Sequence, residues 1–250
     1  MKNQSELLHD RCQKLLKAYK SGELGQTKMP EDSHPNFGVG QSELKLAYFS
    51  LPMALNYQRD SDKLWESTLK TWQDEETREV FNVQLASQVS EERLRACLAK
   101  YKVALQPNKH IATWNKIATV IAEEWGGFDG LLNATNEDYL SLKELVQKRH
   151  KKQFPYLSGP KIFNYWSYIL GEFCDIKLKN REYIEIAPDT HVVRCSVLLD
   201  VITEKEAQTL PVEMIAERWR MLLSETDITP IEMHAPLWFW SMNGFLYSLA

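Results

Sequence analysis

The chain of 250 residues lacks a long apolar run, and no stretch reaches the roughly 20 apolar residues that a membrane helix needs. Its first twenty residues are amphipathic and include acidic side chains, without the uninterrupted apolar core of a secretory signal. These absences predict a protein that does not enter a membrane and that stays in the cytoplasm.

Cysteine is scarce and scattered. No two of the four cysteines have the CxxC spacing of a zinc or iron–sulfur site, and no metal-ligand spacing joins His110 and His234. We therefore expect free thiols and neither a metal nor another cofactor. The cysteines are Cys12, Cys97, Cys174 and Cys195.

A basic excess is also missing, since the formal net charge is −4. Nucleic-acid binders often carry such an excess, so any contact with a polyanion must come from a local patch. One candidate is the segment 143–161, in which six residues are basic and only Glu144 is acidic. Arg149, Lys151 and Lys152 would bind backbone phosphates, and the alternative is a solvated helix end.

Helical periodicity dominates what is present. Only residues 183–186 alternate as a strand does, and four residues cannot make a sheet, so the predicted fold class is all-α. The segment 21–42 concentrates Gly, Pro, Ser and Asp and predicts a long loop. After a first helix, helices are expected at about 44–57, 61–72, 76–88, 91–102, 112–125, 137–150, 160–173, 190–202, 211–224 and 231–248.

Several helix ends carry explicit signals. The pair Gly126-Gly127 predicts a helix end. Helix starts are predicted at Ser90, at the capping-box pair Thr135 and Asp138, and at the first-position prolines Pro160 and Pro211.

Lys161 follows the turn Gly159-Pro160 as the second residue of a predicted helix. The positive end of the helix dipole disfavours its ammonium form, and aromatic neighbours are expected to add desolvation in the same direction. A neutral lysine is a competent nucleophile for a sugar carbon, with which it forms a Schiff base. The alternative is an ordinary exposed lysine at a helix start. The aromatic neighbours are Phe163, Tyr165, Trp166 and Tyr168.

Asp189 occupies the position expected of an N-cap. The apolar face of the next predicted helix begins three residues later at Val192. A purely structural cap is the alternative to a catalytic carboxylate at this position.

Taken together, the two segments resemble the signature of the helix-hairpin-helix DNA glycosylases. A lysine after a glycine turn, a helix, and then the residues DTHVVR at 189–194 are similar to that signature. Residues 114–140 resemble the family's helix before the hairpin, so the likeness covers most of 80–205. The segments 54–66 and 227–245, together with the interval of 28 residues from Lys161 to Asp189, are most similar to the archaeal 8-oxoguanine glycosylase group.

The resemblance implies a site. Lys161 would be the nucleophile and Asp189 the activating carboxylate. Backbone amides at Gly159 would hold a DNA phosphate, as would Arg194. The base pocket would include Asn56, Gln58, Trp65, Tyr165 and His191. The chain departs from the usual pattern in having one glycine, not two, in the hairpin turn, and in Ala235-Pro236 after His234, where the archaeal group carries an aspartate.

The resemblance also implies two interdigitated helical subdomains with a cleft between them. Residues 1–85 would pack with 190–250, and residues 86–189 would form the central subdomain with the hairpin. The expected function is excision of an oxidised purine, 8-oxoguanine, from double-stranded DNA, with AP lyase activity. The protein would act as a monomer, associated with the nucleoid if its source is prokaryotic.

Two alternatives remain. One is a monofunctional or repurposed glycosylase acting on another base or on a nucleoside. The other is a non-catalytic helical module that binds DNA or a protein partner. Steep salt dependence of binding indicates that several cations anchor the protein on duplex DNA. It therefore separates the first alternative from the favoured hypothesis, a glycosylase that acts on duplex DNA.

Overall fold

The computed structural model describes residues 3–25 and 28–249. Every regular element in these ranges is helical and no strand forms, so the predicted all-α class is confirmed. Ile184 and Ile186 are buried, but their segment has no strand partner among the described residues. Within the same ranges no helix combines the length and the apolarity needed to cross a bilayer.

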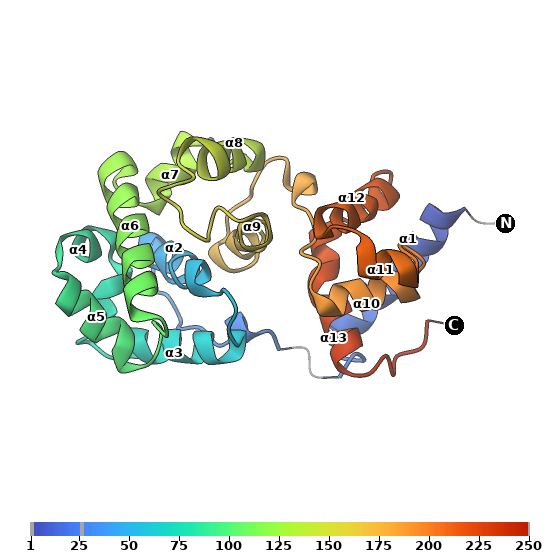
Figure 1. The fold of residues 1–250 in the computed structure, drawn as a ribbon, viewed down its shortest axis with the longest axis horizontal. Coiled ribbons are helices and arrows are strands. Elements are labelled where there is room, and N and C mark those ends of the chain that lie inside the picture. Colours follow the sequence, from blue (N-terminus) through green and yellow to red (C-terminus); the bar gives the residue numbers. More distant parts are fainter. Residues whose placement is uncertain (1–2, 26–27, 250) are drawn as a thin grey trace. The chain divides into compact units, whose positions relative to one another are not determined.

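The helices group into two compact units, drawn in Figure 1. The first unit comprises the described parts of Met1–Met29 and Arg181–Ala250, and the second comprises Pro30–Asn180. The first contains α1 (Gln4–Ser21), α10 (Thr190–Leu198), α11 (Glu204–Thr209), α12 (Val212–Leu223) and α13 (His234–Met242). The second contains α2 (Ser42–Ser50), α3 (Ser61–Gln73), α4 (Val83–Gln88), α5 (Glu91–Lys100), α6 (Pro107–Trp125), α7 (Phe128–Ala134), α8 (Tyr139–Glu144) and α9 (Pro160–Cys174).

Short tight turns connect these helices. They are the 3₁₀ turns η1 (Pro30–Asp32), η2 (Pro52–Leu55), η3 (Arg78–Phe81), η5 (Arg181–Tyr183) and η6 (Pro230–Met233), and the π-helical turn η4 (Leu145–Arg149).

The division of the chain differs from the expected one in its first boundary. Helix α1 packs against α12 and α13, so the N-terminus does associate with the C-terminal helices. Residues 30–85, however, belong to the second unit. An aromatic core explains this: the ring of Phe81 lies 5.7 Å from that of Trp114, and the Trp114 indole donates to the Val80 carbonyl at 3.1 Å. These large apolar surfaces are buried only if η3 and α6 pack together.

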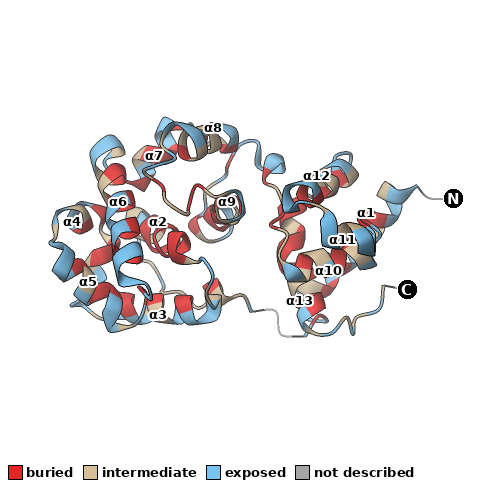
Figure 2. Ribbon diagram, viewed as in Figure 1, coloured by how far each residue is buried: buried red, intermediate tan, exposed pale blue. Residues whose placement is uncertain are grey.

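The first unit has its own core. Trp219 of α12 is fully buried, and its Nε1 donates to the Ser196 hydroxyl of α10 at 2.8 Å. Cys12 of α1 and Leu237 of α13 are buried in the same cluster. Figure 2 shows buried residues concentrated on one side of most helices, the pattern of amphipathic helices around a core.

Most of the predicted helix ends are confirmed. The Ser90 side chain accepts from the Arg93 amide, Pro160 stands in the first turn of α9, and Gly126 ends α6 in the left-handed conformation with φ of 71°. The capping box at 135–138 is wrong. Asp138 caps α8 by accepting from the Ser141 amide. The Thr135 hydroxyl instead donates to the carbonyls of the preceding helix, the usual alternative for a threonine near a helix end.

Several predicted helices are interrupted or shorter than expected, including those at 44–57 and 190–202, which end at Ser50 and Leu198. The helix at 76–88 is divided at Asn82, whose side-chain oxygen accepts from the amides of Gln84 and Leu85 and starts α4. The helix at 137–150 changes to a π-helical turn at Leu145. The last helix, α13, ends at Met242. Local side-chain capping at Asn82 competes with continuation of the helix.

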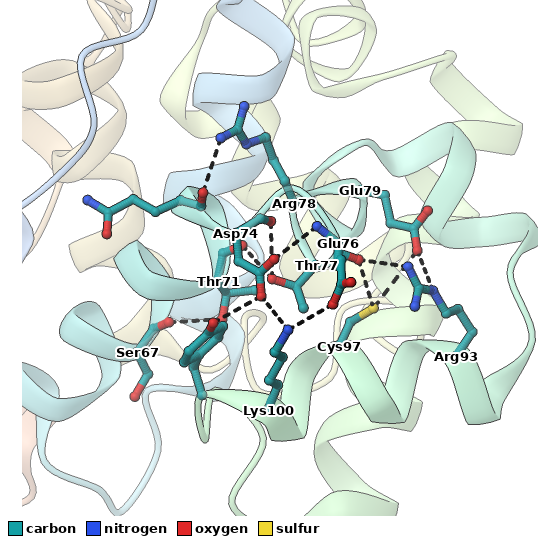
Figure 3. Close-up of polar contacts among 12 residues, drawn as sticks. Ser67, Thr71, Asp74, Glu76, Thr77, Arg78, Glu79, Arg93, Cys97 and Lys100 are labelled. Carbon is teal, nitrogen blue, oxygen red and sulfur yellow. Dashed lines mark hydrogen bonds and ion pairs between the residues drawn. The ribbon is translucent and has the colours of Figure 1, made fainter.

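The turn after α3 is fixed by a polar network, shown in Figure 3. Lys100 of α5 contacts Asp74 at 2.7 Å and Glu76 at 2.9 Å, and Arg93 contacts Glu79 at 2.6 Å. Single exposed ion pairs contribute little to stability, but a network orders several side chains at once. This network holds η3 against α5 and lies outside the predicted site.

Candidate functional site

The predicted hairpin is the connection from α8 to α9, the yellow-green chain between these helices in Figure 1. The Gln147 side chain donates to the Ser158 carbonyl at 3.2 Å, and the Ser158 amide donates to the Phe154 carbonyl at 2.9 Å. Phe154 is buried and its ring lies 6.1 Å from that of Trp125. One buried aromatic anchor and several internal hydrogen bonds therefore order the turn.

The turn presents an uncapped helix start. Gly159 is the N-cap of α9, and it supplies no side-chain hydrogen bond. Pro160 has no amide hydrogen, and the amides of Lys161 and Ile162 fall in the first turn, where a helix offers them no acceptor. Such amides, at the positive end of the helix, can bind an oxyanion such as a phosphate.

A close steric contact explains why glycine stands at position 159. Its φ of −67° is open to any residue, but a Cβ atom would lie 3.1 Å from the Tyr156 carbonyl oxygen. Tyr156 itself has a φ of 61°, which turns the chain sharply just before Gly159. The close approach of the two backbone segments, more than conformational freedom, favours glycine.

Lys161 projects from the first turn of α9 and is exposed. Burial among aromatic rings, which the sequence predicts, is not found. Phe163 and Trp166 are fully buried on the core side of the helix, and the Trp166 indole donates to the Ser50 hydroxyl at 2.8 Å. Tyr165 follows Lys161 by four residues and so shares its side of the helix.

The basic segment adjoins the turn. Arg149, Lys151 and Lys152 are exposed, and the Ser158 hydroxyl donates to the Lys151 carbonyl at 3.4 Å. Arg149 lies 4.0 Å from Glu144, at the edge of ion-pair distance. The structure thus places exposed cations at both ends of the hairpin connection.

The predicted pocket residues of the second unit have different environments. Asn56 accepts a hydrogen bond from Ser61 at 2.9 Å, and Gln58 is exposed with a φ of 47°. Between them, Tyr57 stacks on Tyr156 with ring centroids 5.0 Å apart, which brings the segment 56–58 beside the hairpin turn.

Trp65 is fully buried in α3, with its ring 5.7 Å from that of Phe49. The Tyr165 side chain forms a hydrogen bond with the carboxyl group of Glu31. The sequence did not indicate Glu31 as a site residue. Because Glu31 stands in a segment rich in Gly, Pro, Ser and Asp, nothing in its periodicity distinguishes it from a solvent-exposed loop acid.

Glu31 is an unusual carboxyl group, with a relative exposure of only 1%. Burial raises its pKa from 4.5 to about 7, since the low-dielectric interior disfavours the charged form. The hydrogen bond from Tyr165 acts in the opposite direction, whereas the negative charges of Asp32 and Asp62 add to the effect of burial. Glu31 therefore changes its charge close to neutral pH.

The remaining predicted residues lie in the first unit. Asp189 caps α10, and its Oδ1 accepts from the amides of His191 at 2.9 Å and Val192 at 3.0 Å. The structural role of Asp189 is thereby confirmed. Both capping bonds use one carboxylate oxygen, so the cap and a second role for Oδ2 are compatible. His191 contacts the Ser241 hydroxyl at 3.1 Å, and Arg194 is exposed.

Lys161 and Asp189 thus belong to different units, and each is positioned by the packing of its own unit. The expectation of free thiols is confirmed for all four cysteines, which are buried. In the described ranges no three His, Cys, Asp or Glu side chains are grouped as a metal site would require.

Comparison of the chain with protein-family models, with curated proteins and with solved structures finds no match in any of the three.

Proposed function

We propose that this chain is a DNA glycosylase of the helix-hairpin-helix type, with α8, the connecting turn and α9 as the hairpin. It excises an oxidised purine, 8-oxoguanine, from duplex DNA and cleaves the resulting abasic site as a lyase. One observation carries the proposal: an exposed lysine stands in the uncapped first turn of a helix, directly after a basic segment. A phosphate bound at that turn would hold the adjacent sugar near the lysine amine.

Docking of the duplex uses the hairpin connection. The first-turn amides of α9 bind one phosphate, and Arg149, Lys151 and Lys152 bind others. Since the net charge of the chain is −4, these local cations supply the attraction that the whole protein does not. The damaged base is flipped out of the stack, because its glycosidic bond is inaccessible within the duplex.

In the proposed reaction the Lys161 amine attacks C1′ of the deoxyribose. The bond between C1′ and the base breaks, and its electron pair leaves with the base, which takes up a proton. The sugar ring then opens as the C1′–O4′ electron pair moves to O4′, which is protonated, and the amine nitrogen becomes a C1′ Schiff base. Loss of a proton from C2′ expels the 3′ phosphate. Asp189 stabilises the positive charge that develops on the sugar.

The chemistry of the other candidate nucleophiles favours this assignment. Burial raises the pKa of the thiols of Cys12, Cys174 and Cys195 to about 12, so they are protonated at neutral pH. A protonated, buried thiol is a poor nucleophile. Lys161, by contrast, is accessible to a substrate.

The proposal is tested with end-labelled duplexes that carry 8-oxoguanine, hypoxanthine, uracil or no lesion. We expect strand cleavage at 8-oxoguanine without added alkali. Lys161→Gln should lose this cleavage, whereas Lys177→Gln, which changes another exposed lysine of the same unit, should retain it. Absence of base release and of cleavage at every lesion would refute the function. Base release that needs alkali for cleavage would indicate a monofunctional glycosylase.

A further inference from the structure

A groove of about 380 Å³ lies in the first unit, where the end of α10, α11 and α12 meet the start of α1. Its volume falls within the range of roughly 300–1,000 Å³ that is typical of ligand sites. None of the residues that line it belongs to the predicted glycosylase site. The groove is therefore a separate feature, and its lining indicates what it can bind.

Apolar side chains form the buried part of the lining. Val201 and Ile202 are almost completely buried, and Val197 is half-buried. All three pack on the core of the first unit. Their backbone is fixed, because the amides of Val201 and Ile202 donate to the Ser196 carbonyl at 2.9 and 3.3 Å. The groove thus has a rigid apolar floor, which favours contact with an aliphatic group over contact with water.

Carboxylates form the outer part of the lining. Asp200 and Glu204 are exposed, and Glu206 is half-buried. Arg11 pairs with Asp200 at 2.9 Å, and Arg218 pairs with Glu206 at 2.5 Å. Three carboxylates therefore face two guanidinium groups. Within the described part of the chain, Glu204 has no ion-pair partner, so its charge is available to a ligand.

The chain around the groove extends this negative charge. The segment 200–217 contains five acidic residues and a single basic one, Lys205. Like charges repel across an interface, so a DNA backbone is unfavourable here and a cationic partner is favoured. Exposed apolar side chains flank the same stretch at Leu198, Val212 and Met214. The occupant that fits is cationic and also carries aliphatic surface.

We propose that this groove docks a basic segment of a protein partner, with a lysine side chain as its anchor. The aliphatic stem of the lysine lies on Val197 and Ile202, and its ammonium group pairs with Glu204 and Asp200. Long cationic side chains commonly bury their stems against apolar surface while the charged end stays near water. The inference goes beyond the proposed function and does not depend on it, because neither a base nor a DNA phosphate takes part.

The first test compares three labelled nonapeptides by fluorescence anisotropy with the full chain at pH 6. In the first, lysine alternates with glycine. The second has 2,4-diaminobutyrate in place of lysine, which keeps the charge and removes two methylene groups from each side chain. It should bind about fivefold more weakly, the scale of half-burying two methylene groups. The third has acetyl-lysine, which keeps the stem and removes the charge, and its binding should be lost.

The second test locates the binding site with matched variants. Asp200→Asn combined with Glu204→Gln should weaken the lysine peptide about tenfold, the scale of one lost charged hydrogen bond. Asparagine tolerates the left-handed φ of 61° at position 200, so the fold should be kept. Glu182→Gln combined with Glu225→Gln removes the same charge from two exposed acids of the same unit. In about 0.15 M salt this control should change the affinity less than about twofold, because distant charges are screened.

Three results would overturn the inference. Absence of binding by the lysine peptide, or equal affinity for the lysine and diaminobutyrate peptides, would show that no groove receives the stem, and neither result needs a variant to fold. Equal weakening by the two double variants would show that only the overall charge attracts the peptide. Self-association of the free chain in sedimentation, abolished by Asp200→Asn with Glu204→Gln, would assign the groove to a second copy of the chain in place of another protein.

Discussion

Replacement of Glu31 by glutamine should stabilise the protein at alkaline pH. Glutamine has the same size and can still accept the bond from Tyr165, but it does not ionise. In the native state burial raises the pKa of Glu31 from 4.5 to about 7. As the pH rises from about 4.5, the unfolded chain releases this proton first, while the native state retains it up to about pH 7. The wild type therefore loses stability across this window, and the variant does not.

The size of this stability difference follows from the two pKa values of Glu31, 4.5 in the unfolded chain and about 7 in the native state. Each pKa unit corresponds to about 1.36 kcal/mol, so a rise from 4.5 to about 7 costs the wild type about 3 kcal/mol above pH 7. The variant should be more stable than the wild type by up to about 3 kcal/mol at pH 8, and by less than about 1 kcal/mol at pH 5. Urea denaturation at both pH values measures the difference, with Glu123→Gln as the control.

An equal effect of Glu31→Gln at pH 5 and pH 8 would refute this reasoning, because only the titration of Glu31 makes the effect depend on pH. A larger effect at pH 5 would show that the carboxyl group is ionised in the native state and stabilised there.

Three further predictions concern other positions. Asp189→Asn keeps the helix cap, so it should shift the thermal midpoint by a few degrees at most, but it should slow excision on the order of 10²-fold. Excision at the wild-type rate would leave Asp189 with a structural role alone. Reversal of charge at both Lys151 and Lys152 should weaken binding to all duplexes alike and reduce the slope of log affinity against log salt concentration by roughly two. Unchanged binding at low salt would show that the DNA contacts another part of the surface. The Glu43 carboxylate accepts hydrogen bonds from the first two amides of α7 at 2.8 and 2.9 Å. Glu43→Ala should therefore lower the free energy of unfolding by about 1–2 kcal/mol in denaturant titrations. A change near zero would contradict the role of Glu43 as a helix cap.

Local signals in the sequence predicted local structure well. The cap at Asp189, the first-turn proline at 160 and the helix end at Gly126 each depend on the conformational preferences of one or two residues. Such preferences act without help from distant parts of the chain. The all-α class follows in the same way from periodicity within each segment.

Packing between distant parts of the chain determines the two features that the sequence did not predict, the boundary between the units and the burial of Glu31. Residues 30–85 join the second unit because the Phe81 ring packs on Trp114 of α6, and because Ser50 of α2 accepts a hydrogen bond from Trp166 of α9. Glu31 is buried for a related reason: the turn η1 packs on α3 and Tyr165 reaches its carboxyl group. An acidic residue in a loop is ordinarily exposed, so neither its burial nor its raised pKa has a local signal.

The central claim, that the Lys161 amine forms a Schiff base with the sugar of a damaged nucleotide, is tested most directly by reductive trapping. The protein is incubated with a duplex carrying 8-oxoguanine in the presence of borohydride, which reduces the Schiff base to a stable amine. The cross-linked peptide is then identified by mass spectrometry. We predict a covalent complex that depends on the lesion and carries the modification at Lys161. A complex with the modification on another residue, or one that forms undiminished in Lys161→Gln, would contradict the account.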